Sequence, residues 1–225
     1  MEPEKIGESI EKIAHLSFDL KEGLKKKYGW NESDARITVF NKIINVINTA
    51  NLGYVFISKY LQKKDWWKEN ELFSINEGTI IKTVEEFEMS IRIALIQNVM
   101  YATESSFRIF SRAVQPGACK NGAAEFKSIY SSLLKKTSLQ EKEILLDLFR
   151  NIRNTMHNNG LFFPPNNKNQ EIIFQGKEFH FIVGEHCHFV ETELVVKLTA
   201  NIIVLLQEFI ETPIVSIIEV INEES

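Results

Sequence analysis

This chain has few cysteines, no long apolar run and no excess of positive charge, and each of these features excludes a class of protein. Cys119 and Cys187 are the only 2 cysteines in 225 residues, too few for the disulfide framework of a secreted protein. The most apolar stretch, residues 202–206, is far too short to span a bilayer, and the N-terminus lacks the basic start and apolar run of a signal peptide. We therefore expect a soluble, cytoplasmic protein that does not act in a membrane.

The charge balance and the missing motifs narrow the function further. A formal net charge of -4 argues against a broad binding surface for long duplex nucleic acid, but leaves room for a small, locally basic site. No Gly-rich phosphate loop and no Gly-x-Ser-x-Gly elbow occurs, so kinase, P-loop, dinucleotide-binding and serine-hydrolase signatures are absent. With 44% hydrophobic residues, the chain can build the core of one large domain or two small ones.

Apolar residues recur at helical spacing along most of the chain and predict an all-α fold. We expect helices over residues 6–20, 39–60, 77–114, 123–136, 138–160 and 194–221, the last interrupted near Pro213. The stretch 77–114 is either one very long helix or two abutting ones. Residues 63–70 are expected to form a polar connection that carries Trp66 and Trp67, and residues 171–184 a small β-hairpin insertion.

The helix that ends before Gly160 carries the most informative pattern in the chain. Ser138 and Glu141 stand at capping-box spacing and predict where it begins. Its buried face is predicted to hold Leu145, Phe149, Ile152 and Met156. A residue one position further along lies about 100° round the helix, at the border of that buried face.

Arg150, Arg153 and His157 occupy this border. Residues seven apart on a helix lie about 20° from one another around the axis, and residues four apart about 40°, so the three side chains form one stripe. Two cations and a titratable imidazole in a row suit a phosphate group. A half-covered stripe of this kind can line a cleft.

A second group, His180, His186, Cys187 and His188, raises the question of a metal site, because His-x-His on a strand places two imidazoles on one face. On one extended strand His180 and His186 would lie about 20 Å apart, so they share an ion only if the chain reverses between them. No further ligands stand at the spacing of a structural zinc site. We expect solvated or hydrogen-bonded hairpin histidines, and no metal or cofactor.

Arg150, the six residues after it and His157 resemble the signature of the HEPN superfamily. That signature is an Arg, usually followed by a polar residue such as Asn, and then a His after four to six intervening residues. Residues 152–160 also resemble the Arg-Asn-x-x-His-x-x-Gly wording of some HEPN-like bacterial proteins, in which a short hairpin and a long helix follow. The resemblance covers about residues 77–211 and does not address the N-terminal third.

The resemblance implies an up-and-down bundle of four or five helices in residues 77–225, with the helices of residues 1–76 packed against it. Proteins of this superfamily often dimerise so that two Arg/His motifs face one cleft. Many act as metal-independent endoribonucleases in toxin, phage-defence or RNA-processing systems. For this chain the resemblance implies a homodimer, RNA or a nucleotide as ligand, and an antitoxin or defence protein as partner.

The family spacing assigns the acid/base role to His157 and the phosphate role to Arg150. RNA cleavage without a metal needs a base for the 2′-hydroxyl proton and cations for the charge that gathers on the phosphate oxygens. Arg153 competes with Arg150 for this role, because helical side chains lean toward the N-terminus and His157 tilts back over Arg153. Asn154 and Asn151 are candidates to orient the imidazole or to bind the RNA backbone.

Glu104 and Arg108, on the preceding long helix, are second-rank candidates that would add a carboxylate and a cation to the site.

A simpler alternative needs no catalysis, because Arg and His before Asn-Asn-Gly also make a favourable helix C-terminus. The chain would then be a non-catalytic helical module for nucleotide binding, dimerisation or partner docking. Burial of His157 against Met156 and Leu146 would favour this module, whereas symmetric, exposed His157 side chains in a basic cleft would favour the nuclease.

Overall fold

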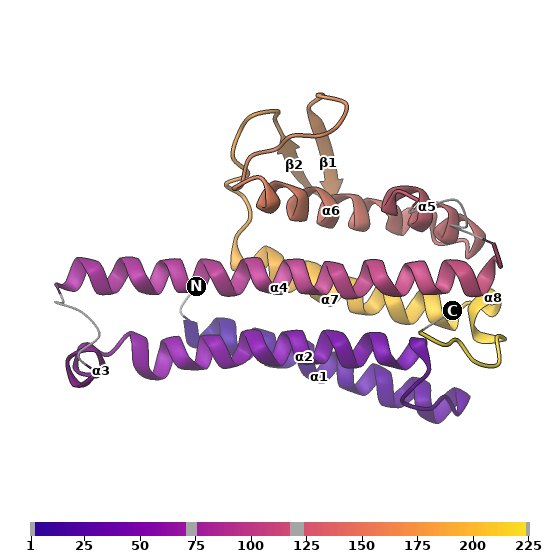
Figure 1. The fold of residues 1–225 in the computed structure, drawn as a ribbon, viewed down its shortest axis with the longest axis horizontal. Coiled ribbons are helices and arrows are strands. Elements are labelled where there is room, and N and C mark those ends of the chain that lie inside the picture. The colour runs from indigo at the N-terminus through magenta and orange to yellow at the C-terminus, as the bar shows by residue number, and fades with distance from the viewer. Residues whose placement is uncertain (1–2, 71–75, 118–123, 224–225) are drawn as a thin grey trace.

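Helices make up most of the computed structural model, which describes residues 3–70, 76–117 and 124–223 (Figure 1). Its elements are α1 (Pro3–Tyr28), α2 (Ala35–Phe56), the π-helix η1 (Ile57–Leu61), α3 (Lys64–Glu69), α4 (Glu77–Val114), α5 (Phe126–Lys136), the 3-10 helix η2 (Gln140–Lys142), α6 (Glu143–His157), β1 (Gln170–Phe174), β2 (Lys177–Phe181), α7 (Thr192–Glu211) and α8 (Pro213–Ser216). The predicted helical fold with a small antiparallel hairpin is confirmed. The HEPN-like bundle and the boundary near residue 76 stay predictions. None of the helices in the described ranges combines the length and the apolar composition that crossing a membrane requires.

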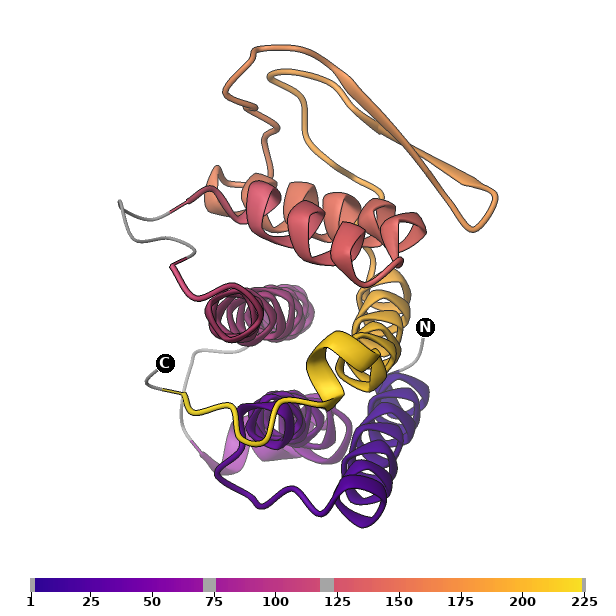
Figure 2. The same ribbon diagram turned by 90° about the vertical axis from the view of Figure 1, so that its right-hand side faces the viewer.

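The elements form layers on the two sides of α4 and α7 (Figure 2). On one side α2 packs on α4 and α1 packs on α7, while α5 and α6 pack on the other side. The hairpin covers the outer side of α6. Because side chains alternate between the faces of a strand, the hairpin turns one set inward, and these are buried: Ile172, Phe174, Phe179 and Phe181. α6 therefore lies between the hairpin and α4.

α4 is one continuous helix of 38 residues, which decides against two abutting helices. Its N-cap is Asn76, whose side chain accepts a hydrogen bond from the Thr79 backbone N–H at 2.9 Å. The helix ends shortly before Pro116, a residue that cannot continue it. α4 passes α2 so closely that a Cβ added to Gly53 would lie 2.5 Å from Cδ1 of Ile91. Glycine at this position therefore allows the two helices to touch.

Three phenylalanines form the aromatic centre of the core. The ring centroid of Phe209 on α7 lies 5.1 Å from that of Phe107 and 5.5 Å from that of Phe110, both on α4. All three side chains are fully buried. Ring pairs at these separations attract each other beyond the gain from apolar burial. They hold α7 against α4, and α7 then ends before the predicted break at Pro213.

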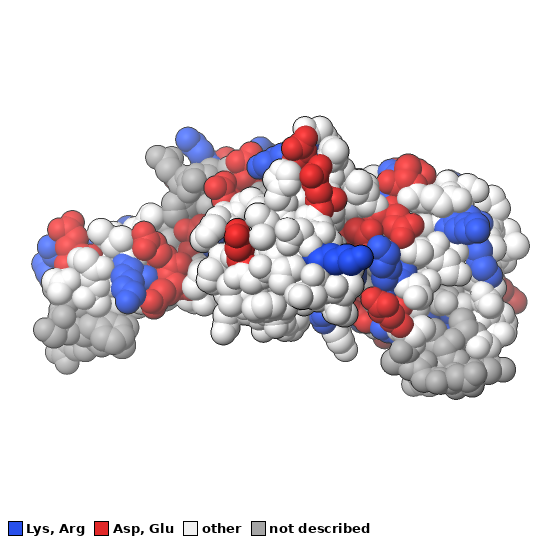
Figure 3. Space-filling model, turned by 90° about the horizontal axis from the view of Figure 1, so that it is seen from above, with Lys and Arg blue, Asp and Glu red and all other residues white. Residues whose placement is uncertain are grey.

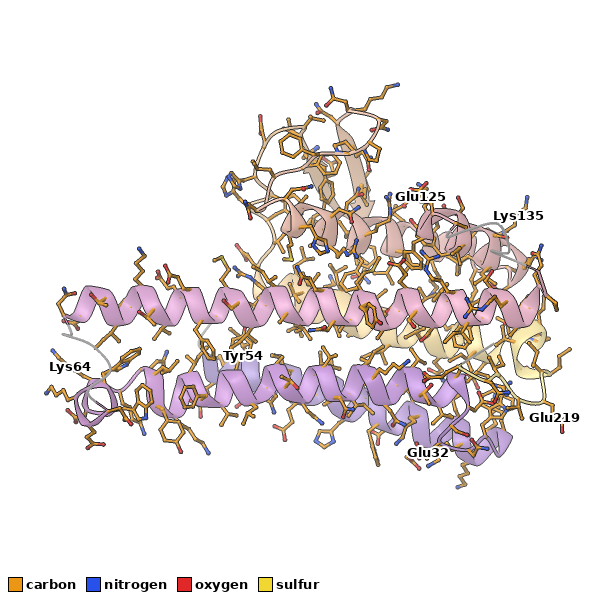
Figure 4. The ribbon with its side chains drawn as sticks, viewed as in Figure 1. Glu32, Tyr54, Lys64, Glu125, Lys135 and Glu219 are labelled. Carbon is orange, nitrogen blue, oxygen red and sulfur yellow. The ribbon has the colours of Figure 1, made fainter. Side chains whose placement is uncertain are left out.

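A buried ion pair ties the start of α2 to the end of the chain. The fully buried guanidinium of Arg36 donates to both carboxylate oxygens of Asp34, at 2.8 and 2.6 Å. Its other N–H groups donate to three backbone carbonyls of the C-terminal segment, those of Val215, Ile218 and Glu219. The guanidinium carbon also lies 3.8 Å from the ring centroid of Trp30. Glu32 and Glu219 mark this end of the molecule in Figure 4.

The predicted start of the motif helix is wrong. Ser138 has a φ of 59°, outside the extended region that an N-cap residue adopts, so it forms no capping box with Glu141. Residues Gln140–Lys142 form η2 instead, and α6 begins at Glu143 without a side-chain cap.

The polar connection predicted over residues 63–70 contains a helix, α3. Trp67 of α3 is buried and donates from its indole Nε1 to the carbonyl oxygen of Leu61 at 2.7 Å. The Trp66 ring packs edge-on against Phe56, with centroids 5.6 Å apart. Two tryptophans therefore anchor a segment whose remaining residues are polar.

Candidate functional site

The last turn of α6 presents His157 to solvent. The helix stops there because Asn159 and Gly160 have φ values of 53° and 85°, and the Gly160 N–H donates to the Thr155 carbonyl at 2.8 Å. This confirms the predicted glycine stop. The cap accounts for the Asn and Gly residues by itself. The cap leaves the imidazole of His157 exposed. Burial of this imidazole was the arrangement expected to favour the non-catalytic module.

Arg153 lies one turn before His157 and is half-buried. Its Nη1 donates to Oδ1 of Asn154 at 3.1 Å, a partner that carries no charge. Within residues 3–70, 76–117 and 124–223 it forms no salt bridge with a carboxylate. Side chains four residues apart are neighbours on a helix surface, so an arginine charge without an acidic partner lies beside the exposed imidazole.

Arg150 has a different environment. Only 17% of its side chain is exposed, and its Nη2 lies 3.5 Å from Oδ1 of Asp147 on the preceding turn. The same carboxylate accepts a hydrogen bond from the Tyr130 hydroxyl and lies 3.2 Å from Nζ of Lys127, both on α5. Burial, followed by the hydrogen bond to Asp147, raises the pKa of Tyr130, which therefore stays a donor. Arg150 thus belongs to a charge cluster that joins α5 and α6.

Reasoning from the sequence missed this cluster. The available signal was Asp147, which stands three residues before Arg150 and is a neighbour on the helix surface. The contributions of Lys127 and Tyr130 depend on how α5 packs against α6, which no local spacing reveals.

Asn151 and Asn154 lie in different surroundings. The Asn151 side chain is buried and donates from Nδ2 to Oε1 of Gln170 at 2.7 Å, where β1 begins. It therefore links α6 to the hairpin. Asn154 is half-buried and contacts Arg153, on the flank that leads to His157.

Glu104 and Arg108 bind each other on α4. Nη2 of Arg108 lies 2.6 Å from Oε1 of Glu104, and its Nη1 donates to the carbonyl oxygen of Ala124 at 3.0 Å. Both side chains are one-quarter exposed. Among the described residues, no hydrogen bond or salt bridge joins either of them to the Arg/His motif.

The histidines of the hairpin region are spread over two places. His180 on β2 lies 3.6 Å from Glu171 and 3.5 Å from Glu178. The rings of His186 and His188 have centroids 5.8 Å apart in the connection to α7. In the part of the chain that the structure describes, no three His, Cys, Asp or Glu side chains gather closely enough to hold a metal ion.

Cys187 is a free thiol beside the end of α6, whereas Cys119 lies outside the described residues. The backbone N–H of Cys187 donates to the Gly160 carbonyl at 3.1 Å. Burial raises the pKa of the Cys187 thiol to about 11, against a smaller lowering by its hydrogen bond with Thr155. The thiol is therefore protonated and neutral near pH 7.

We expect alkylation of Cys187 by iodoacetamide to be slow in the folded protein, because only the thiolate reacts. Relative to the protein unfolded in urea, the rate at pH 7.5 should fall by about 10²-fold and then rise with pH up to about 11. Peptide mapping by mass spectrometry separates this site from Cys119. A rate that levels off near pH 8.5 would contradict the buried environment.

The face that carries the hairpin has mixed charge. Figure 3 shows its lysine and arginine side chains interspersed with aspartate and glutamate, around a wide area without charged side chains. Among the described residues drawn there, no broad basic field covers this face. The net charge of -4 agrees with such a surface.

Comparison of the chain with protein-family models, with curated proteins and with solved structures yields no match. The features that bear on function are therefore the spacing of the motif and the geometry at the end of α6. The residues at the centre of both features are His157, Arg153 and Arg150.

Proposed function

We propose that this chain is a metal-independent endoribonuclease of the HEPN type that works as a homodimer. The observation that carries the proposal is the exposed imidazole of His157 beside Arg153, an arginine without a carboxylate partner among the described residues. The hairpin and long helix that follow the motif support the same assignment. A toxin or phage-defence setting, with an antitoxin or defence protein as partner, is part of this proposal.

In the proposed reaction His157 accepts the proton of an RNA 2′-hydroxyl, whose oxygen attacks the adjacent phosphorus. The bond from phosphorus to the 5′-oxygen breaks, which leaves a 2′,3′-cyclic phosphate and a 5′-hydroxyl. The imidazolium of the second motif in the dimer returns a proton to the leaving oxygen. Arg153 stabilises the charge on the non-bridging oxygens. Arg150 binds Asp147, the carboxylate that holds α6 to Lys127 and Tyr130 of α5.

Cleavage of a labelled RNA pool in EDTA tests the proposal. We expect the wild-type protein to leave 2′,3′-cyclic phosphate ends, and the rate to fall by about 10²- to 10⁴-fold in His157→Ala, because the variant lacks the group that moves the proton. His180→Ala is the matched control, since it removes another exposed histidine that lies on β2. Equal rates for wild type and His157→Ala, or no cleavage at all, would reject the nuclease.

A non-catalytic helical module is the second candidate. It is supported by the Arg150–Asp147 contact and by the helix cap at Gly160, which explain much of the motif as structure. This candidate predicts a homodimer, or binding of a nucleotide, that survives His157→Ala in a protein without cleavage activity. Sedimentation velocity and nucleotide titration of both proteins distinguish it from the nuclease.

A further inference from the structure

A cavity of about 460 Å³ opens beside the motif, between α4, the end of α6 and the connection from β2 to α7. In Figure 1 this connection descends past the end of α6 toward α4. Met156 and Asn159, which precede and follow His157 in the sequence, line the cavity, whereas His157 does not. The volume is in the range of about 300–1,000 Å³ that small-molecule sites occupy.

One part of the cavity wall is aliphatic. Met89 and Ile93 come from α4, Met156 from α6, and Val190 from the connection to α7. Methionine side chains are flexible and adapt to ligands of irregular shape. No Phe, Tyr or Trp is among the described lining residues, and the one aromatic ring, that of His186, belongs to an exposed residue, so the cavity offers a nucleobase little on which to stack. An alkyl chain is the group that such walls suit.

The charge in the cavity is positive. Arg92 of α4 lines it, is half-buried, and forms no hydrogen bond or salt bridge within the described parts of the chain. Glu88, one turn before Arg92 on α4, accepts a hydrogen bond from Thr192 at 3.2 Å and does not line the cavity. Thr192 in turn contacts the hydroxyl of Tyr54, which lies on the side of α2 that faces α4 (Figure 4).

The other side chains that line the cavity add no negative charge to it. No Asp or Glu is among the described residues that line the cavity, and the thiol of Cys187 is neutral near pH 7. His186 stands at the rim, where its Nδ1 would lie 3.0 Å from a Cβ added to Gly160. A guanidinium that is partly removed from water gains most from an anion that binds it directly.

We propose that this cavity binds a small aliphatic anion, with a carboxylate against Arg92 and an alkyl chain between Met89, Met156 and Val190. The site is separate from the proposed nuclease and does not depend on it. It combines a cationic anchor with an aliphatic wall and a few polar side chains, the usual composition of a small-molecule site.

Calorimetric titration with octanoate, and with 1-octanol as the neutral analogue, tests the site. We expect saturable octanoate binding that weakens by about 10- to 100-fold in Arg92→Met, as expected for loss of a charge-assisted hydrogen bond. The variant should bind 1-octanol as the wild type does. Lys82→Met is the matched control, because it removes a positive charge from an exposed position on α4.

Val190→Trp provides a second test that keeps Arg92. The larger side chain intrudes from the connecting loop on the part of the cavity assigned to the alkyl chain, so octanoate binding should weaken while the circular dichroism spectrum stays that of the wild type. Octanoate affinity that is unchanged in Val190→Trp or in Arg92→Met, or an absence of saturable binding to the wild type, would overturn the proposal.

Discussion

Replacement of Arg36 by methionine is expected to lower the free energy of unfolding by about 3–5 kcal/mol. The Arg36 guanidinium is fully buried, and its 5 hydrogen bonds use all of its N–H donors. The variant leaves the Asp34 carboxylate, which is 2% exposed, without the cation that balances it. Urea denaturation followed by circular dichroism measures the loss.

The double variant Asp34→Asn with Arg36→Met separates the charge from the packing. Asparagine keeps the N-cap that Asp34 provides to the Arg36 backbone N–H, but carries no charge. If the unbalanced carboxylate causes most of the loss, the double variant is more stable than Arg36→Met alone. A double variant of equal or lower stability would show that lost packing and the three backbone contacts dominate.

Replacement of Arg153 by glutamine is expected to slow RNA cleavage by about 10²- to 10³-fold, the typical effect of removing one group that stabilises transition-state charge. Arg150→Gln should slow it by less than tenfold, because Asp147 already binds that guanidinium. The two variants change the same residue type on the same helix, so they are matched in chemistry. Single-turnover rates in EDTA measure both effects.

This comparison decides which arginine acts in the proposed reaction. Thermal unfolding serves as the control, and Arg150→Gln should be the less stable of the two because it disrupts the contacts between α5 and α6. The reverse order of cleavage rates would return the phosphate role to Arg150. Equal, small effects of both substitutions on the cleavage rate would show that neither arginine takes part in the reaction.

The helical layout could be predicted from the sequence because its signals are local. Apolar periodicity marks α4 over almost its whole length, and the predicted limits of residues 77 and 114 agree with the structure. The glycine stop after the motif and the turn between β1 and β2 are equally local. The start of α6 was predicted wrongly, because the residues suit a capping box but the backbone of Ser138 does not.

The surroundings of the site could not be predicted, since they depend on residues far apart in the chain. The border position of Arg150, Arg153 and His157 follows from helix geometry. Their different surroundings depend on α5, whose Lys127 and Tyr130 join Asp147 of α6 in the cluster around Arg150, whereas Arg153 contacts no carboxylate among the described residues. The cavity at Arg92 likewise needs three separate segments to meet.

The contacts of Arg36 also bear on when the protein can finish folding during its synthesis. The carbonyl groups that bind Arg36 lie 179, 182 and 183 residues further along the chain. Chains generally fold from the N-terminus as they emerge from the ribosome, and contacts over long sequence distances form late. Arg36, near the junction between α1 and α2, therefore cannot form these hydrogen bonds until residues 215–219 have been translated. A chain interrupted before that point keeps a guanidinium without these acceptors.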